Sequence, residues 1–418
     1  MLKIVYPICC GIDVHKTFIY CCIATTDSKG ITKYKSKRFS TFTNDLKRCA
    51  DWLQENNCKD VCMESTGKYW IPVFNILEVS CNIVLAHPKY VKAIKGKKTD
   101  KKDAKWIADL FKHDLINGSF IPPADIRQLR DLTRYRYKLT NFTVGEKNRA
   151  QNCLTVSNIK LDAVFTDVFG KASSNIINAL LLNPSEKISD VSQFRTRGMK
   201  STNEEILAAI DGNICNEQAE KLKIIRSHMD SIEECKANLE SVILNLAEKY
   251  LPQLNLILTV PGIKSFSAVS IISEIGVDMS VFPTSKNLVS WAGCCPRNDK
   301  SNKTVKSSRI SRAGSCLKPT LVQVANAVIK SKDHPEFGIR YRRIKAHRGH
   351  KKAIIAICRM LLTAIWNVIS KREPYSPDGY AVPQPSFVAK PLTKSQGLAL
   401  LRQMGYVIKD DNPPPVPA

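Results

Sequence analysis

The order of strand and helix patterns in the N-terminal part of the chain limits the fold more than any other feature. Three strand patterns come first, at residues 8–14, 17–26 and 31–39. Helix and strand patterns then alternate, at residues 43–56, 60–65, 68–78, 82–86 and 100–114. Strands that alternate with helices in this way predict an α/β domain.

Four acids fall where such a domain would bring them together. Asp13 lies inside the first strand pattern and Glu64 near the end of the fourth, while Asp100 and Asp103 begin the last helix pattern on one face. Three strands followed by alternating helices and strands are the order of a ribonuclease H-like domain, which we place at residues 1–125. In this topology the four acids converge at one edge of the sheet.

Carboxylates gathered at one place need cations. An unpaired buried carboxylate is costly to fold around, and Asp13 sits among apolar and small residues in ICCGIDV. Four such groups repel one another unless divalent cations neutralise them, and oxygen ligands suit Mg²⁺ or Mn²⁺. Two ions about 4 Å apart would polarise a phosphodiester. The alternative is that Asp100 and Asp103, which lie in the segment KGKKTDKKDAK, are ordinary charges on a solvated helix face.

The chain carries a large excess of positive charge. It has 63 Lys and Arg against 38 Asp and Glu, a net charge of +25 and a pI near 9.5. This balance predicts a polyanionic partner, and nucleic acid is favoured over a membrane because no basic amphipathic helix or lipidation motif stands at either end. Two basic segments suit contact with phosphates, through Lys97, Lys98, Lys101, Lys102, Arg340, Arg342 and Arg343. The alternative is that they are ordinary solvated charges.

The 15 cysteines predict reduced thiols in a cytoplasmic protein. No signal-peptide pattern precedes Asp13, and the cysteines occur singly or as adjacent pairs, without the spacing of a zinc site. The longest apolar run, at residues 353–369, contains Arg359 and is shorter than a usual bilayer span. We therefore expect a buried helix there and no membrane partner.

The rest of the chain divides by pattern into three parts. Residues 126–250 are helical and include a seven-residue apolar repeat at Ile225, Ile232, Leu239 and Leu246. This repeat predicts either a coiled coil or one amphipathic helix packed within the subunit. Residues 251–372 are mainly helical, and residues 373–418 are rich in proline and predict a flexible tail.

Three sequence blocks resemble the signature blocks of the DEDD transposases with a RuvC-like domain: GIDVHK, MESTGKYWIPV and KTDKKDAKWIADL. These transposases are the IS-one-ten family of insertion-sequence recombinases, which has Piv-like invertases as relatives. Later blocks resemble the long helix after that domain and the family's C-terminal transposase domain, including TVPGIKSFSAVSIISEIG and WAGCCPRNDKSNK. The resemblance extends from about Ile8 to Ile369.

This resemblance implies a recombinase that moves its element between double-stranded donor and target DNA, guided by a structured noncoding RNA. It also implies that a serine in residues 251–372 attacks DNA and holds it as a phosphoserine intermediate. The matching position is Ser301, although Asn302 stands where the family has glycine, and Ser307, Ser308 and Ser315 lie nearby. Asn tolerates left-handed backbone angles better than most residues, so the turn is compatible with this change. The alternative is that Ser301 is a solvated turn residue of this polar loop.

The serine would work with partners from elsewhere in the chain. No histidine lies near Ser301 in the sequence, so the metal-bound acids of the first domain would have to activate it in a composite active site. Flanking cations could stabilise phosphate charge or be ordinary surface residues; they are Arg297, Lys303, Arg309 and Arg312. The resemblance favours dimerisation through the heptad repeat, with dimers pairing to a tetramer.

Three other functions fit parts of the sequence. An actin-like kinase also opens with GID on a first strand, but Val14, His15 and Lys16 supply none of the glycines that admit phosphates. A junction-resolving nuclease would use the acids and leave Ser301 inert. A nucleic-acid-binding protein that has lost cleavage is the third, and the presence of all four acids argues against it.

Overall fold

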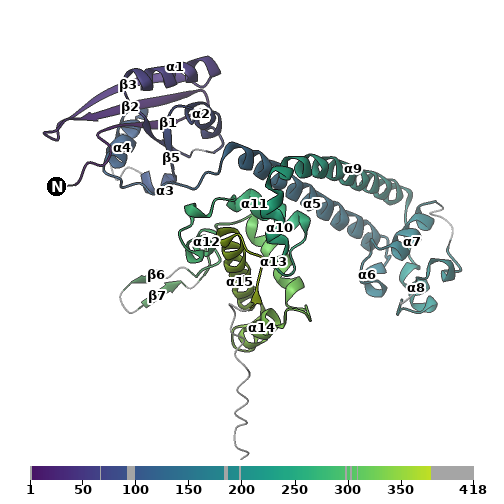
Figure 1. Cartoon of the computed structure of the whole chain (residues 1–418). Coiled ribbons are helices and arrows are strands. Elements are labelled where there is room, and N and C mark those ends of the chain that lie inside the picture. The colour runs from purple at the N-terminus through teal and green to yellow at the C-terminus, as the bar shows by residue number, and fades with distance from the viewer. Residues whose placement is uncertain are drawn as a thin grey trace, which may run out of the picture.

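The computed structural model describes residues 2–65, 67–91, 99–182, 187–196, 199–296, 299–301, 304–307 and 309–377. These residues form an N-terminal domain with a mixed sheet, then a long pair of helices, and then a helical domain that carries a β-hairpin (Figure 1). The sequence predicted this succession of an α/β domain and two helical regions.

The N-terminal sheet has the strand order β3-β2-β1-β4-β5. Its strands are β1 (Ile8–Val14), β2 (Phe18–Thr26), β3 (Thr32–Ser40), β4 (Asp60–Glu64) and β5 (Asn82–Ala86). β2 runs antiparallel to β1 and β3, whereas β4 runs parallel to β1 and β5. The accompanying helices are α1 (Thr43–Glu55), α2 (Trp70–Leu77), α3 (Pro88–Val91) and α4 (Asp100–Lys112). The predicted order of elements is confirmed, with the short α3 as an addition.

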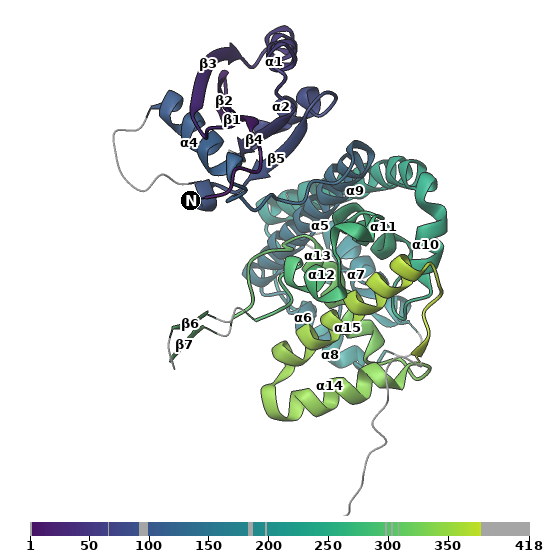
Figure 2. The same cartoon turned by 60° about the vertical axis from the view of Figure 1, so that its left-hand side comes forward.

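Alternate residues of β1 face opposite sides of the sheet, because side chains in a strand alternate. Ile12 and Val14 belong to the apolar core that α1 and α2 cover. Cys9 belongs to a second core, on the other face, with Phe111 of α4. Asp13 is four residues after Cys9 and therefore lies on the same face of the sheet as Cys9. Helix α4 covers this face, and Figure 2 shows α4 beside the strands.

Two long helices connect the sheet domain to the rest of the chain. α5 and α9 lie side by side in Figures 1 and 2, and the smaller elements between them gather at the end far from the sheet. The elements of this region are α5 (Ala124–Val156), α6 (Leu161–Val164), α7 (Lys171–Leu182), η1 (Ser192–Phe194), α8 (Asn203–Ile210) and α9 (Asn216–Ala247). They share an apolar core of their own.

The heptad repeat of α9 packs partly against the same chain. Ile225 and Ile232 are buried, and α9 contacts α5 along its length. Leu246 is 41% exposed, whereas Ile243, outside the repeat, is fully buried. The buried residues therefore lie on the side of α9 that packs against α5. An amphipathic helix packed within the subunit was one of the two predicted arrangements. A coiled coil between subunits stays a prediction.

The C-terminal region is a helical domain around α15. Its elements are η2 (Glu248–Tyr250), α10 (Leu251–Leu258), α11 (Ser265–Ile275), η3 (Met279–Val281), α12 (Ser285–Trp291), β6 (Asp299–Ser301), β7 (Thr304–Ser307), α13 (Leu317–Val328), α14 (Pro335–Arg348) and α15 (His350–Lys371). Ile357, Leu361 and Ile365 of α15 are fully buried in the core that these helices share. The β6–β7 hairpin projects from this domain in both views (Figures 1 and 2).

Among the described residues, α15 alone is long and apolar enough to cross a membrane by length and composition. Its most apolar stretch is 56% buried inside the structure, which agrees with the predicted buried helix. Arg359 lies on its exposed side.

The beginning of the proline-rich segment is anchored to the helical domain. The Tyr375 backbone N–H donates to Thr259 Oγ1 at 2.8 Å, and its hydroxyl donates to Glu336 Oε1 at 2.9 Å. The remainder of the predicted tail, from residue 378 onward, lies outside the described residues.

Candidate metal centre and nucleic-acid interface

Asp13 is held near the end of β1, where the sheet and α4 shield it from water. Only 8% of the residue is exposed. Burial raises the pKa of Asp13 above its ordinary value; the charge and hydrogen bond of His15 oppose this rise, and the Asp103 and Asp100 carboxylates add to it. A cation bound beside Asp13 would favour its ionised form.

Gly11 allows α4 to come close to β1. A Cβ atom at Gly11 would lie 2.3 Å from the Ala104 carbonyl oxygen and 2.4 Å from the Ala108 backbone nitrogen. These distances are too short for any side chain, so a larger residue would push the helix outward. Ala104 and Ala108 are themselves small and fully buried. The close approach brings the first turn of α4 to the end of β1.

That first turn carries two of the predicted acids. Thr99 caps α4, because its hydroxyl accepts a hydrogen bond from the Lys102 backbone N–H at 3.3 Å. Asp100 and Asp103 follow in the first turn, where the helix dipole stabilises negative charge. The helix start thus presents two carboxylates towards the buried Asp13.

His15 joins the two elements at this point. Its Nε2 atom lies 3.1 Å from Asp13 Oδ2 and 3.4 Å from Asp100 Oδ1. Its ring packs against Phe18 of β2, with ring centroids 4.5 Å apart, and Phe18 also lies under the Arg38 guanidinium. No role for His15 had followed from the sequence. The signal was its position two residues after Asp13, since alternate residues along an extended chain share a face.

Glu64 lies on the strand next to Asp13. The parallel pairing of β1 and β4 includes Ile12 with Met63, so Asp13 and Glu64 are the next residues along the two strands. Neighbouring strands lie about 4.8 Å apart, and paired residues point to the same face. Glu64 is therefore at the same end of the same sheet face as Asp13.

Three ligand atoms in the described part of the chain already form a group that suits a cation. One atom each from Asp13, His15 and Asp100 lie within 4.8 Å of one another, while Glu64 and Asp103 stand outside this group. Two carboxylates suit Mg²⁺ or Mn²⁺, which prefer oxygen ligands, whereas the imidazole nitrogen suits a transition-metal ion better than Mg²⁺. Such an ion, when bound, would polarise a phosphodiester at the sheet edge.

The predicted phosphate-binding cations lie in several places. Lys101 and Lys102 are exposed in the first turn of α4, beside the acids. The C-terminal cations are also exposed, near the hairpin and on α14: Arg309, Arg312, Arg340, Arg342 and Arg343. The other predicted cations lie outside the described residues: Lys97, Lys98, Arg297 and Lys303.

Ser301 is the last residue of β6 and pairs with Thr304 of β7. The sequence predicted a polar loop here, and the structure has a short hairpin with Ser301 near its tip. Both views show the hairpin standing apart from the N-terminal sheet (Figures 1 and 2). The structure therefore brings Asp13, His15 and Asp100 together but does not place Ser301 among them within one subunit.

Two family models match the chain on either side of the long helices. A DEDD model for IS110 elements, described as transposase, matches residues 10–159, and a model described as the transposase IS116/IS110/IS902 family matches residues 254–342. Together they cover more than half of the chain. The chain belongs to the IS110 family of transposases. The first match spans all four acids of this IS110 family member, and the second spans Ser301.

Two curated relatives are pilin gene-inverting proteins. The protein from Moraxella bovis is 29% identical over 153 residues, which are 36% of this chain and 47% of the relative. The protein from Moraxella lacunata is 31% identical over 130 residues, which are 30% of this chain and 40% of the relative. The chain thus spans less than half the length of either.

A solved structure of fowlpox virus resolvase with substrate Holliday junction DNA shares 18% sequence identity. The match covers 25% of this chain and 72% of the resolvase chain. Its TM-score is 0.18, which is too low to establish a common fold.

Proposed function

We propose that this IS110 family member is a DNA transposase that cleaves and exchanges DNA strands. The observation that carries the proposal is the meeting of Asp13 and Asp100 across β1 and α4, with His15 between them. A buried carboxylate at such a meeting point suits a divalent cation, Mg²⁺ or Mn²⁺. We assign the ligand set to Asp13, Glu64, Asp100 and Asp103.

Ser301 is the proposed nucleophile. Its hydroxyl gives up a proton as Oγ bonds to phosphorus, the ester bond to the deoxyribose oxygen breaks, and that oxygen takes up a proton. The DNA end then stays on the protein as a phosphoserine until a hydroxyl of another strand displaces the serine. The family match over residues 254–342 and the projection of the hairpin from its domain support this role.

We propose that acids and serine meet between subunits. The hairpin stands apart from the sheet of its own chain, so a second copy is the natural source of the serine. Dimers that pair to a tetramer would hold donor and target duplexes together. The net charge of +25 suits binding of both DNA and a noncoding guide RNA, and we place the activity in the cytoplasm.

A covalent-adduct assay tests this function. The protein is incubated with end-labelled duplex DNA that carries the element's junction, with its co-purified RNA and Mn²⁺, and detergent gels separate protein-bound label. Wild type and the control Ser315→Ala, an exposed serine outside the hairpin, should form an adduct. Ser301→Ala should form none and should not exchange strands. Normal recombination by Ser301→Ala would refute the serine role.

A junction-resolving nuclease is the second candidate, and one observation favours it. Asp13, His15 and Asp100 form a group that suits a cation without any contribution from Ser301. If Ser301→Ala still cuts DNA without an adduct, this nuclease function is supported instead.

The guide RNA has its own test. RNA that co-purifies with the protein is sequenced, and the protein is then treated with ribonuclease and assayed again. Enrichment of one RNA from the element and loss of strand exchange after treatment are expected. Full activity of the treated protein would refute guidance by RNA.

A further inference from the structure

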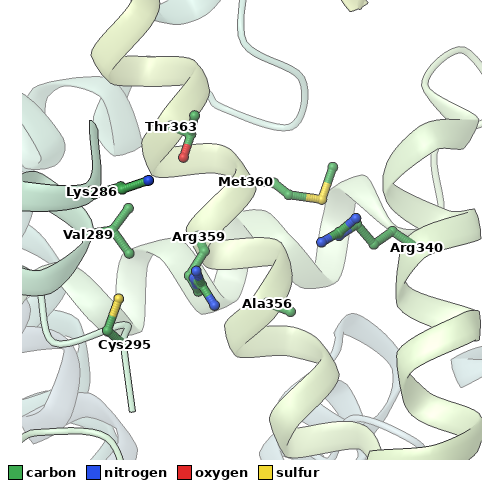
Figure 3. A pocket seen from close by; sticks show the side chains of 8 residues that line it. All are labelled: Lys286, Val289, Cys295, Arg340, Ala356, Arg359, Met360 and Thr363. Atoms are coloured by element: carbon green, nitrogen blue, oxygen red, sulfur yellow. The ribbon is translucent and has the colours of Figure 1, made fainter. Parts of the chain in front are cut away.

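A cavity in the C-terminal domain gathers positive charge from three helices. It has a volume of about 250 Å³ and opens between α12, α14 and α15. Lys286 of α12, Arg340 of α14 and Arg359 of α15 line it (Figure 3). In this view the Lys286 amine and the Arg340 guanidinium point inward from opposite sides, with Arg359 between them. We call this cavity the cationic pocket.

Within the described part of the chain, none of these three cations forms an ion pair. Some arginines in other parts of the chain have close carboxylate partners. Arg134 binds both oxygens of Glu274, and Arg127 binds Glu78. Three like charges that converge without a carboxylate repel one another, and an anion bound among them would remove that repulsion. The cationic pocket therefore has the charge of an anion site.

The rest of the lining specifies what kind of anion fits. Val289, Ala356 and Met360 form an apolar wall, which lowers the effective dielectric and strengthens attraction to an anion. The Thr363 hydroxyl adds a neutral hydrogen-bond donor. Guanidinium groups, an amine and a hydroxyl are the donors that contact phosphate oxygens in nucleic-acid complexes. A backbone phosphate with part of its sugar is small enough for the volume.

The pocket lies at the base of the Ser301 hairpin. Cys295 lines the pocket, and the next residue, Pro296, pairs with Ile310 in the bridge that closes the hairpin base. A phosphate held in the pocket would thus fix a strand beside the segment that leads to the proposed nucleophile. This continuity favours DNA, since DNA is the strand that the serine would attack.

We propose that the cationic pocket binds a backbone phosphate of duplex DNA through Lys286, Arg340 and Arg359. The choice of DNA rests on the proposed function, whereas the choice of an anion rests on the pocket alone. Lys286 and Arg359 are thereby added to the residues that hold nucleic acid.

The salt dependence of DNA binding tests this proposal. Affinity for labelled duplex DNA is measured by fluorescence anisotropy from low to moderate salt, with EDTA present so that no cleavage occurs. Each phosphate contact contributes about 0.9 to the slope of log K against log salt. Lys286→Gln and Arg359→Gln should each reduce the slope by about this amount. Lys371→Gln removes a charge from the exposed end of α15, outside the pocket, and should leave the slope close to that of wild type.

Several outcomes would overturn the proposal. One is that Lys286→Gln and Arg359→Gln both keep the wild-type slope of log K against log salt, although both unfold at the same temperature as wild type. Another is an equal loss in Lys371→Gln, which would mean a diffuse effect of net charge. A changed slope for single-stranded RNA alone would assign the pocket to RNA. Binding of inorganic phosphate that Arg359→Gln abolishes, with an unchanged DNA slope, would assign it to a free ligand.

The pocket and the proposed function can fail separately. If wild type forms no adduct and yet the pocket variants lower the DNA slope, the transposase mechanism is wrong and the phosphate site stands. If wild type forms the adduct and both pocket variants keep its slope, the function stands and the phosphate site is wrong.

Discussion

At the residue scale, Gly11 determines how closely the acids can approach. The carboxylates of Asp13 and Asp100 come together because α4 lies directly against the backbone of β1 at this glycine. The sequence showed GID on a strand but could not show that a helix nearly a hundred residues later would touch it. Long-range contacts of this kind depend on tertiary packing and leave no local pattern.

We predict that Gly11→Ala destabilises the N-terminal domain by about 1–3 kcal/mol, because its Cβ would overlap the α4 backbone. Urea unfolding measures the change. Gly145→Ala is the control, since its Cβ would meet the flexible Arg149 side chain at 3.5 Å in the middle of α5. That control should be neutral or slightly stabilising. Equal stability of Gly11→Ala and wild type would contradict the packing described for α4.

His15 gives a second prediction at this scale. If its Nε2 atom helps to hold the cation or orient the acids, His15→Gln should weaken Mn²⁺ binding about 10-fold or more. Electron paramagnetic resonance of free Mn²⁺ measures this without any DNA. His113→Gln, at the other end of α4 where the ring contacts the Lys3 carbonyl, is the matched control. Identical Mn²⁺ affinity in both variants would remove His15 from the site.

At the element scale, α5 is fastened to α11 through a buried charge cluster. Arg134 binds Glu274 with distances of 2.7 and 2.8 Å, and Arg130 donates to the Ser273 and Glu274 carbonyl oxygens. Burial lowers the pKa of Arg130 to about 10, against the opposing charge of Glu274. The negative charge of Glu274 therefore offsets the cost of burying the Arg130 and Arg134 guanidinium groups.

We predict that Glu274→Ala destabilises the protein by about 3 kcal/mol, because it leaves Arg130 buried without its carboxylate. Glu233→Ala removes an exposed partner of Lys236 on α9 and should cost less than about 1 kcal/mol. Chemical denaturation of both variants gives the comparison. Similar losses in the two would mean that the cluster does not fasten α5 to α11.

Some helices and strands were easier to predict from the sequence than others. The strands and helices of the first domain have clear apolar periods, so their order followed directly. The β6–β7 hairpin is short and polar, and such a segment reads as a loop. Ile225 and Ile232 of the seven-residue repeat are buried, as expected. A straight helix has 3.6 residues per turn, so positions seven residues apart gradually rotate away from one face. The next buried isoleucine is therefore Ile243, which is outside the repeat.

At the scale of the whole molecule, Asp125 links the start of α5 to η2, the short helix that follows α9. It accepts hydrogen bonds from Lys249 and from the Tyr250 hydroxyl. The Lys249 hydrogen bond is the largest of the contacts that lower the pKa of Asp125 to about 2, from an ordinary value of 3.8. A lowered pKa means that the stabilisation is complete above about pH 4 and is lost as the pH falls towards 2.

We predict that Asp125→Asn flattens the fall in stability between about pH 4 and pH 2. Thermal unfolding at a series of pH values measures it, with Asp51→Asn on the exposed side of α1 as control. An acid dependence unchanged from wild type would contradict the role of Asp125.

The division of acids and serine between two distant parts of the chain also predicts complementation. Asp13→Asn keeps its serine and Ser301→Ala keeps its acids, so neither should form a DNA adduct alone. A mixture of the two should restore part of the adduct if subunits exchange and the site forms between them. No recovery in mixed assemblies, shown by size to contain both chains, would place the whole site in one subunit.

The most direct test of the metal centre is the yield of detergent-resistant DNA adduct as Mn²⁺ is added to wild type and to Asp13→Asn. The structure and the family together predict an adduct in wild type that rises with Mn²⁺ and disappears in EDTA. They predict none in Asp13→Asn at any Mn²⁺ concentration, with the fold unchanged by circular dichroism. A wild-type yield in Asp13→Asn, or in EDTA, would contradict the metal centre on which the proposed function depends.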